Sequence, residues 1–323
     1  MLKIIEAGST TVQDLGRFGY YYYGIPPSGA ADKYSFMAGN ILLNNPIDSA
    51  GIEIALFGPK ILFAKETVIS ITGAPMTPYR NNRSIPMWEN IKVNAGDILH
   101  FSPPEKGAKS YLCVSGGIQV PKVLESRSTC IKSGLGGFRG RNLKVGDKLP
   151  IGEPLPGVFE RVGQSLHDKL LPDFREYIEP RVIMGISVGL ISDEGIKSFL
   201  DTEWKISNES NRVAYRLQGS FVKFKTFRSP FGAGDSSSNV VDAPYPIGAV
   251  LIPNEEEVNV ILHDGAIGGG FAMIGAVISV DLDEIAQSRP MQTIRFSAVT
   301  MSQALEARKN RQRKISELKD FCK

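Results

Sequence analysis

Residues 16–32 read GRFGYYYYGIPPSGAAD, and this stretch combines an aromatic run with a turn rich in glycine and proline. If the four tyrosines at 20–23 are extended, their rings alternate between the two faces of a strand. The turn that follows places Ser28 and nearby backbone N–H groups where they can face a ligand. The alternative is an aromatic strand followed by a purely structural turn. We interpret the tyrosines as packing or partner contacts.

Length and composition limit the possible protein classes. The chain has 323 residues, which favours two domains, and its 33 glycines and 20 prolines favour β structure with many turns. A formal net charge of +3 is too small to indicate nucleic-acid binding. No apolar run approaches the length of a membrane span, and the start lacks the apolar core of a signal peptide, so we expect a cytoplasmic protein with no membrane partner.

The cysteines and histidines give no sign of a metal centre. Cys113, Cys130 and Cys322 are few, odd in number and far apart, which argues against a disulfide framework or a zinc site. Of the three histidines, only His263 has a ligand-type neighbour, Asp264. We therefore expect no metal site and interpret the cysteines as buried or incidental thiols.

Local patterns predict many short strands and few helices. Apolar residues recur at helical spacing after Asp32, which is a candidate N-cap, and a second short helix is predicted over 193–200 with Asp193 as its cap. Residues 134–140 are glycine-rich but lack the Gly-Lys-Ser/Thr of a phosphate-binding loop. Strands are expected at 2–6, 10–13, 52–57, 60–63, 67–72, 91–93, 97–101, 110–114, 181–185, 203–206, 212–218, 221–227, 249–252, 258–262 and 276–280.

A set of motifs resembles the biotin-dependent carboxyltransferase, or allophanate hydrolase subunit 2, family. The family includes the C subunit of the ATP-dependent 5-oxoprolinase, the KipI antagonist KipA and the carboxyltransferase part of urea carboxylase. The resemblance extends over about residues 11–296. The motifs are TVQDLGR (11–17), GIPPSGAAD (24–32), GN (39–40), Glu53, GP (58–59), TGA (72–74), GD (96–97), GGI (116–118), SRST (126–129), GGFRGR (136–141), GD (146–147), SNR (210–212), YRL (215–217) and Gly219.

The resemblance implies a mainly β fold with two cyclophilin-like β-barrel subdomains and a few short helices. We expect an N-terminal subdomain over 1–165, a C-terminal subdomain over 166–300 and a surface helix over 301–323. The resemblance also implies two partner subunits, one KipI-like and the other LamB/YcsF-like, with the active cleft between subunits. A homo-oligomer is also compatible with it.

One segment departs from the family pattern. Residues 264–273 read DGAIGGGFAM, where the family has DRQTTGGYPK. Asp264, Gly269 and Gly270 remain, but the arginine, glutamine, threonines, tyrosine and lysine are replaced by residues that cannot donate those hydrogen bonds. If those groups bind a carboxylate or a carboxybiotin carbonyl, their loss removes contacts worth roughly 1.5–3 kcal/mol each.

Amide hydrolysis and carboxyl transfer both need donors for a developing oxyanion and a positioned acid or base. The predicted catalytic residues are Asp264, Arg127 and Arg212. For the arginines the alternative is a structural ion pair, for Asp32 an N-cap, and for Ser28 a bond to its own backbone. The predicted substrate-binding residues are Ser28, Gly29, Asp32, Ser128, Asn211, Gly269 and Gly270.

Three functions follow from this sequence. The first is the C subunit of a 5-oxoprolinase-type complex that cleaves 5-oxoproline to glutamate, with ATP acting through the complex and no cofactor bound by this chain alone. The second is a non-catalytic antagonist that binds a KipI-like protein, which the change at 265–273 favours. The third is a carboxyltransferase component of a urea carboxylase or allophanate hydrolase type system, with biotin on a separate carrier.

Overall fold

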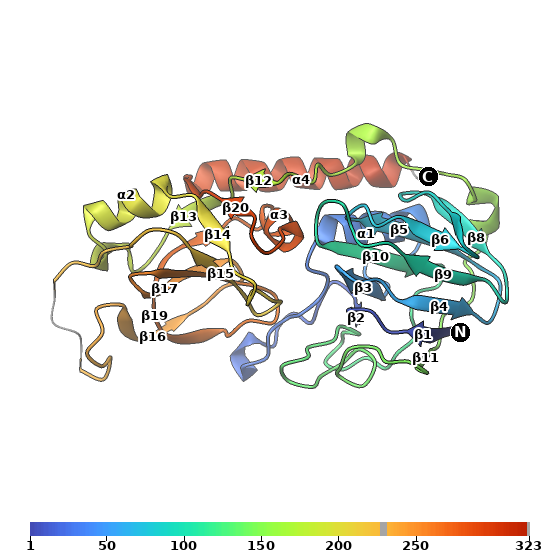
Figure 1. Cartoon of the computed structure of the whole chain (residues 1–323), viewed down its shortest axis with the longest axis horizontal. Coiled ribbons are helices and arrows are strands. Elements are labelled where there is room, and N and C mark those ends of the chain that lie inside the picture. Colours follow the sequence, from blue (N-terminus) through green and yellow to red (C-terminus); the bar gives the residue numbers. More distant parts are fainter. Residues whose placement is uncertain (227–230, 322–323) are drawn as a thin grey trace. The chain divides into compact units, whose positions relative to one another are not determined.

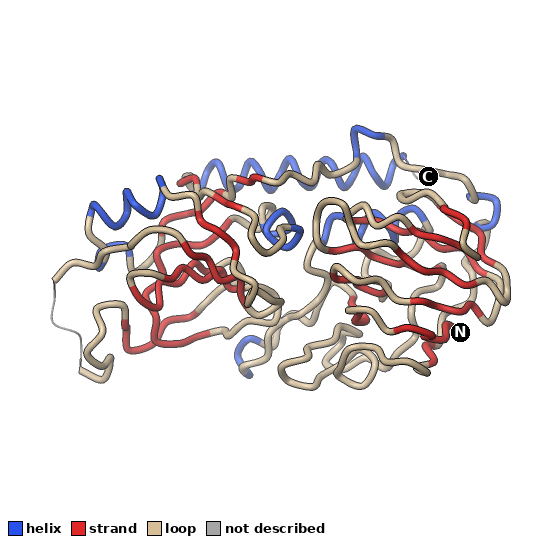
Figure 2. The backbone as a smooth tube through the Cα atoms, viewed as in Figure 1, coloured by secondary structure: helices blue, strands red, loops and turns tan. Residues whose placement is uncertain are grey.

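The computed structural model describes residues 1–226 and 231–321 and is mainly β with few helices, as predicted (Figures 1 and 2). The chain divides into two compact units. Unit 1 comprises Met1–Phe18, Pro27–Phe174 and Gln312–Lys323, and unit 2 comprises Gly19–Pro26 and Arg175–Arg311. The tyrosine run at 20–23 therefore belongs to unit 2, although it is inserted in the sequence of unit 1.

Two antiparallel sheets make up most of unit 1. One has the order β11-β1-β4-β9-β6-β7 and the other the order β2-β3-β10-β5-β8. The strands are β1 (Leu2–Glu6), β2 (Thr10–Gln13), β3 (Gly51–Ala55), β4 (Lys60–Phe63), β5 (Thr67–Gly73), β6 (Pro78–Arg80), β7 (Arg83–Ser84), β8 (Asn90–Val93), β9 (Ile98–Phe101), β10 (Lys109–Val114) and β11 (Lys148–Leu149).

The core of unit 1 contains apolar side chains from both sheets. In the second sheet, Leu112 of β10 lies opposite Ile52 of β3 and Ile71 of β5, and all three side chains are fully buried. Leu2 of β1 and Phe63 of β4, from the first sheet, join the same cluster. Since side chains alternate along a strand, each strand directs half of its residues into this core.

Helix α1 (Lys33–Leu42) packs on the second sheet of unit 1. Phe36 joins Tyr111 and Cys113 of β10 in one buried cluster, and a Cβ on Gly39 would approach Cys113 Sγ to 2.9 Å. Burial raises the pKa of Cys113 to about 12, so this thiol stays protonated at neutral pH. Cys130 is buried as well, and Cys322 lies outside the described residues.

One mixed sheet dominates unit 2. Its order is β12-β20-β14-β15-β18-β17-β19-β13-β21, and β16 pairs with β19. The elements are β12 (Tyr177–Ile178), β13 (Arg181–Met184), α2 (Asp193–Asp201), β14 (Trp204–Ile206), β15 (Ala214–Gln218), β16 (Asn239–Pro244), β17 (Ala249–Asn254), β18 (Glu257–Ile261), β19 (Gly268–Val277), α3 (Leu282–Gln287), β20 (Thr293–Ile294) and β21 (Ser297–Ala298). The core of this unit includes Trp204 from the sheet, Phe199 from α2 and Ile285 from α3.

The prediction of an extended tyrosine run is wrong. Tyr21–Tyr23 form a 3-10 helix, η1, which ends at Gly24 in the left-handed region with φ of 74°. The Gly24 N–H donates to the carbonyl of Tyr21 at 2.9 Å, and glycine adopts this backbone conformation without steric cost. Tyr22 is 92% exposed, and its ring lies edge-on to the Tyr23 ring with the centroids 5.5 Å apart. The other 3-10 helices are η2 (Val158–Arg161), η3 (Asp168–Leu170) and η4 (Val188–Leu190).

Two further sequence predictions need correction. Helix α2 is capped by Ser192, whose hydroxyl accepts from the Gly195 N–H at 3.0 Å, and not by Asp193, which is the first helical residue. The strand predicted at 276–280 is instead β19, which begins at Gly268 and ends at Val277. The strand predicted at 221–227 ends outside the described residues, and in its described part Phe224 makes an isolated bridge with Ile191.

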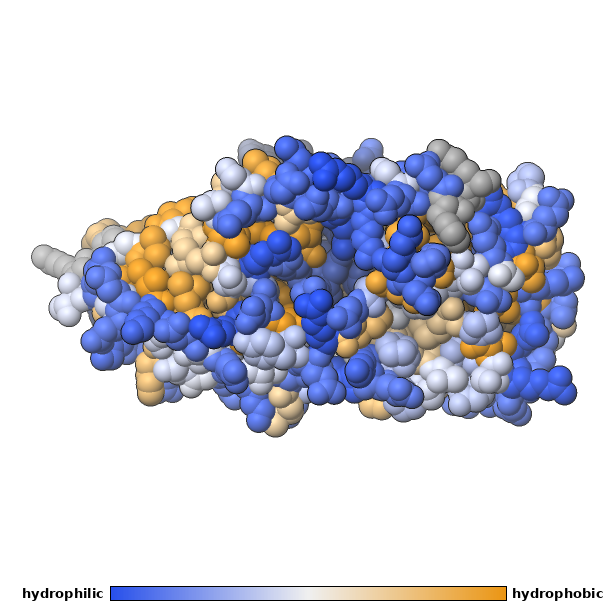
Figure 3. Space-filling view, turned by 90° about the horizontal axis from the view of Figure 1, so that it is seen from above, coloured by the Kyte–Doolittle hydropathy of each residue, from blue (hydrophilic) through white to orange (hydrophobic). Residues whose placement is uncertain are grey.

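Helix α4 (Met301–Phe321) ends the described chain and is divided between the units at residue 311. Most of its described side chains are exposed, but Leu318 is fully buried in a cluster of unit 1 with Tyr34 and Trp88. Figure 3 shows a mainly hydrophilic surface in the view from above, with hydrophobic side chains gathered on part of unit 2. Within the described residues, no helix is both long enough and apolar enough to span a membrane.

Candidate functional site

Four loops of unit 1 pack together near Asp14, and we call them the loop cluster: residues 14–17, 27–32, 126–129 and 134–141. The Asp14 carboxylate accepts from the Ser126 hydroxyl at 2.7 Å, from the Arg127 backbone N–H at 2.5 Å and from the Ser128 hydroxyl. It also accepts from the Gly16 N–H at 2.8 Å. Asp14 is 7% exposed, so one buried carboxylate fixes two loops that are more than 100 residues apart in sequence.

The loop at 27–32 lies alongside the turn at 14–17. The Arg17 N–H donates to the Pro27 carbonyl at 2.7 Å, and the Ala30 N–H donates to the Asp14 carbonyl at 2.8 Å. Gly29 has φ of 91°, and a Cβ there would lie 2.7 Å from the backbone of Leu15. A side chain at Gly29 would therefore separate the two loops.

Two buried side chains support the end of this loop. The Ala31 N–H donates to Glu53 Oε2 at 2.8 Å, and the Asp32 N–H donates to the Tyr111 hydroxyl at 2.7 Å. That hydroxyl donates in turn to Glu53 Oε2 at 3.0 Å. Burial and the neighbouring charges of Glu53 and Asp32 raise the pKa of Tyr111 well above its usual value, so the hydroxyl remains a donor.

Asp32 and Ser28 have different environments within the loop. The Asp32 carboxylate caps α1 by accepting from the Ser35 N–H at 3.0 Å and from the Ser35 hydroxyl at 2.6 Å, which is the N-cap predicted from sequence. Ser28 has φ of 54° and is fully buried, and its Oγ has no hydrogen-bond partner among the described residues. The alternative considered from sequence, a bond of Ser28 to its own backbone, is therefore not formed, and its hydroxyl has bonding capacity for a ligand or a water.

Arg127 and Ser128 anchor the loop cluster. The Arg127 Nε–H donates to the Val120 carbonyl at 2.9 Å, and Nη2 donates to the Gln119 side-chain carbonyl at 3.1 Å. These partners are neutral, so these bonds of Arg127 are not the ion pair considered from sequence. Ser128 uses its hydroxyl on Asp14, and its carbonyl accepts from the buried Arg17 guanidinium.

The glycine-rich loop packs against the chain itself. A Cβ on Gly136 would collide with the Ser128 carbonyl, one on Gly137 with the Thr129 side chain, and one on Gly140 with the backbone of Gly134. All three glycines have positive φ. The three glycines therefore allow this loop to pack closely against its neighbours, where a side chain would not fit.

The remaining predicted site residues lie in unit 2. Arg212 Nε and Asp264 Oδ2 are 2.9 Å apart, with side chains 13% and 3% exposed. Asn211 caps a turn by accepting from the Val213 N–H at 2.8 Å. The backbone N–H of Asp264 also donates to the Arg212 carbonyl at 3.0 Å, so the structure brings two of the three predicted catalytic residues together as a buried ion pair.

Gly269 and Gly270, predicted as substrate-binding residues, belong to strand β19. A Cβ on Gly269 would lie 3.1 Å from the Tyr245 ring, and one on Gly270 would lie 3.2 Å from the Val240 carbonyl. The Tyr245 hydroxyl accepts from the Phe271 N–H at 2.6 Å. The glycines therefore let β19 approach β16 and Tyr245 closely.

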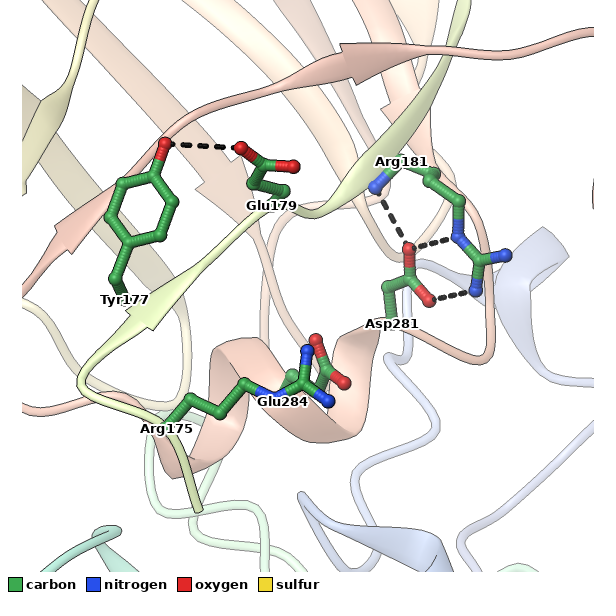
Figure 4. A pocket seen from close by; sticks show the side chains of 6 residues that line it. All are labelled: Arg175, Tyr177, Glu179, Arg181, Asp281 and Glu284. Atoms are coloured by element: carbon green, nitrogen blue, oxygen red, sulfur yellow. Dashed lines mark hydrogen bonds and ion pairs between the residues drawn. The ribbon is translucent and has the colours of Figure 1, made fainter. Parts of the chain in front are cut away.

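A polar pocket of about 490 Å³ opens in unit 2, away from the residues predicted from sequence (Figure 4). Asp281 holds Arg181 at one end through two side-chain bonds of 2.6 and 2.9 Å, and this pairing raises the pKa of Arg181. At the other end, the Tyr177 hydroxyl donates to Glu179 at 3.3 Å. Arg175 and Glu284 complete the lining. Among the described residues, no three His, Cys, Asp or Glu side chains are grouped to hold a metal ion.

The sequence-based reasoning missed the residues that organise unit 1. Asp14 and Glu53 stand within the family motifs, but only the fold shows that they bind loops together. Tyr111 and Arg17 were not predicted as site residues either. A signal was available for Asp14, Glu53 and Arg17, because an acidic or arginine side chain in an otherwise apolar strand or tight turn must be paired when it is buried.

Comparisons with known proteins all point to one family of carboxyltransferase domains. The model of the carboxyltransferase domain, subdomain A and B, matches residues 23–298. The C subunit of the Escherichia coli 5-oxoprolinase is 33% identical over 319 residues, which cover 98% of this chain and 97% of that protein. The urea amidolyase of Lachancea kluyveri is 35% identical over 96% of this chain, but the chain spans 17% of that protein. The crystal structure of the K. lactis urea amidolyase superposes with a TM-score of 0.91 at 33% identity, over 98% of this chain and 20% of that one.

Proposed function

Because the chain belongs to the family of carboxyltransferase domains with subdomains A and B, we propose that it acts as the C subunit of a 5-oxoprolinase-type complex. In this complex it would help to hydrolyse 5-oxoproline to glutamate in the cytoplasm. Its partners would be two other subunits, one KipI-like and the other LamB/YcsF-like.

The main support for this proposal is how much of the E. coli 5-oxoprolinase C subunit the chain covers. Nearly every segment of the E. coli protein, the C subunit of 5-oxoprolinase, has a counterpart in this chain, whereas the urea amidolyases contain large parts that have none. The loop cluster adds support, because its motifs converge on one buried network in unit 1. Hydrolysis of 5-oxoproline is therefore a better guide to this chain than the whole reaction of urea amidolyase.

Opening a lactam ring requires donors for the oxyanion that forms at its carbonyl. Ser28 is our candidate, because its buried hydroxyl has no partner within the described chain and lies in a loop fixed by Asp14 and Glu53. Arg127 and Ser128 would hold that loop in place. Asp264 and Arg212 neutralise each other in unit 2, so we assign them to the stability of that unit.

ATP would act through the partner subunits. Residues 134–141 lack the Gly-Lys-Ser/Thr of a phosphate-binding loop, which argues against phosphate binding there. In a carboxyltransferase of this family, biotin would supply the activated carboxyl group from a separate carrier. This function is the weaker candidate for this chain, because the chain spans only 17% of the Lachancea kluyveri urea amidolyase and 20% of the K. lactis one.

A non-catalytic antagonist that binds a KipI-like protein is the second candidate. The observation that favours it is the composition of residues 265–273, which contain only glycine and apolar side chains. In the fold, the end of this segment forms part of β19, and Phe271 is 43% exposed. Such a strand offers contact area to a partner but few side-chain donors to a substrate.

Reconstitution distinguishes the two candidates. The chain is purified with its KipI-like and LamB/YcsF-like partners, and ATP-dependent release of glutamate from 5-oxoproline is measured. We expect glutamate release that requires all three chains and that falls by roughly tenfold or more in Ser28→Ala, because one oxyanion donor is worth that much. A stable complex that releases no glutamate above the level without this chain would contradict the catalytic proposal and favour the antagonist.

A further inference from the structure

Cationic residues line one edge of the first sheet of unit 1. The edge strand β11 lies beside β1 (Figure 1), and their register places Lys148 directly opposite Lys3. Both of these lysines are exposed. The loop that leads into β11 adds Arg139, Arg141 and Lys144, of which Arg139 and Lys144 are exposed. We call these residues of β1, β11 and the loop the basic face.

Asp147 connects the loop of the basic face to the sheet. Its carboxylate accepts two hydrogen bonds from the Arg141 guanidinium, at 2.7 and 2.9 Å, and one from the Lys144 N–H at 2.7 Å. The Asp147 carbonyl accepts from the Ile4 N–H of β1 at 2.9 Å. The bonds from Arg141 lower the pKa of Asp147, and the nearby charge of Arg139 lowers it further. Asp147 therefore offsets the charge of Arg141 alone.

The other four cations of the basic face form no ion pair within the part of the chain that the structure describes. Lysines elsewhere in unit 1 do have acidic partners. Lys60 of β4 pairs with Glu6 of β1 at 3.4 Å, and Lys65 pairs with Glu153 at 2.6 Å. The basic face therefore presents a local excess of positive charge, although the net charge of the whole chain is only +3.

Two features of the basic face disfavour the chain on its own. Lys3 and Lys148 are like charges at directly opposite positions of antiparallel strands, where they repel each other. Arg139 has φ of 61°, a left-handed conformation that is costly for a residue with a Cβ, and its guanidinium lies 5.3 Å from the centroid of the Phe138 ring. A lysine on an edge strand also prevents strands from pairing, but this accounts for Lys148 alone. Acidic groups bound to the basic face would relieve the repulsion.

We propose that the basic face docks on an acidic surface of the KipI-like subunit. The cations belong to two strands and a loop and are exposed, so they suit several carboxylates spread over a protein surface better than one small anion. The small net charge of the chain argues against nucleic acid as the partner. The KipI-like subunit is the partner in both candidate functions, and the inference rests on that part of the proposed function.

Binding of the purified KipI-like subunit to the full chain tests the docking surface. The association rate constant is measured by surface plasmon resonance at low ionic strength and at about 0.15 M salt. Lys144→Glu/Lys148→Glu should lower it roughly tenfold or more at low ionic strength and should weaken its dependence on salt. Arg83→Glu/Lys169→Glu is the matched control. It changes the net charge equally, at the exposed Arg83 of β7 on the opposite edge of the sheet and at the exposed Lys169 of η3, and should bind as the wild type.

Stability of the free chain provides a second readout. Lys148→Glu places a carboxylate opposite Lys3, so it should raise the urea midpoint of unfolding while it slows binding. A higher midpoint with unchanged binding would show a solvated face and overturn the inference.

The remaining outcomes separate this inference from the proposed function. A complex that releases glutamate and assembles equally well with Lys144→Glu/Lys148→Glu overturns the inference alone, as does a KipI-like subunit that does not bind. Duplex DNA that binds the chain in place of the subunit, and is lost in the same variant, overturns it in favour of nucleic acid. Salt-sensitive binding that the variant abolishes, in a complex that releases no glutamate, supports the inference and contradicts the proposed hydrolysis.

Discussion

At the scale of single residues, the loop cluster depends on Asp14. Its carboxylate accepts hydrogen bonds from two hydroxyls and two backbone N–H groups, and it is almost fully buried. Every one of these partners is a donor, so the group at this position must be an acceptor on both of its oxygens. An amide in its place would direct an NH2 group at a donor.

Asp14→Asn should therefore destabilise the protein by about 2–4 kcal/mol and disorder the loops at 14–17 and 126–129. Urea unfolding followed by circular dichroism measures the loss. Asp48→Asn is the matched control, because Asp48 is exposed and its replacement should change stability by less than about 0.5 kcal/mol. Equal stabilities of the two variants would show that Asp14 does not organise the cluster.

The roles of residues that contact only their neighbours in sequence could be predicted from the sequence. The cap at Asp32 could be predicted because an N-cap depends on the next three residues only. The ion pair of Arg212 with Asp264 and the bonds of Asp14 to Ser126 and Ser128 could not, since they join residues that are 52 to 114 positions apart. Arg212, Asp264 and Ser128 were predicted as site residues, but the residue to which each one bonds was not predicted.

At the scale of elements, strands with β-branched residues were predicted well and glycine-rich ones were not. The bounds of β1, β2 and β4 agree with the prediction. β19 was predicted eight residues late, because Gly268, Gly269 and Gly270 carry no side-chain pattern. The structure shows why glycine suits these positions: a Cβ would lie close to the Ala243 carbonyl, the Tyr245 ring and the Val240 carbonyl, respectively. The tyrosine run failed for a related reason, since the backbone turn at Gly24 outweighs the strand propensity of tyrosine.

The final turns of α4 allow a test at this scale. Leu318 is fully buried in the cluster with Tyr34 and Trp88, whereas Leu305 of the same helix is 49% exposed. Leu318→Ala should cost about 2–5 kcal/mol, because it removes buried apolar volume and leaves a cavity. Leu305→Ala should change stability by less than about 0.5 kcal/mol. Urea unfolding of the two variants measures the difference, and a similar small loss in both would mean that the end of α4 does not pack on unit 1.

At the scale of the whole molecule, each unit has its own hydrophobic core. The core of unit 1 lies between two sheets, and the core of unit 2 is built on one sheet with α2 and α3. The two tryptophans of the sequence are divided between them, with Trp88 in unit 1 and the fully buried Trp204 in unit 2. A Trp88→Phe background therefore makes fluorescence a reporter of unit 2.

In that background, Arg212→Met should lower the stability reported by Trp204 by about 3–5 kcal/mol, because it leaves the carboxylate of Asp264 buried without its guanidinium partner. Adding Asp264→Asn should recover part of the loss by removing the buried charge. Arg216→Met is the control, since Arg216 forms an exposed pair with Glu209 and such pairs contribute about 0–1 kcal/mol. If Arg212→Met costs no more than Arg216→Met, the buried pair does not stabilise unit 2, and Asp264 would again be a candidate for catalysis.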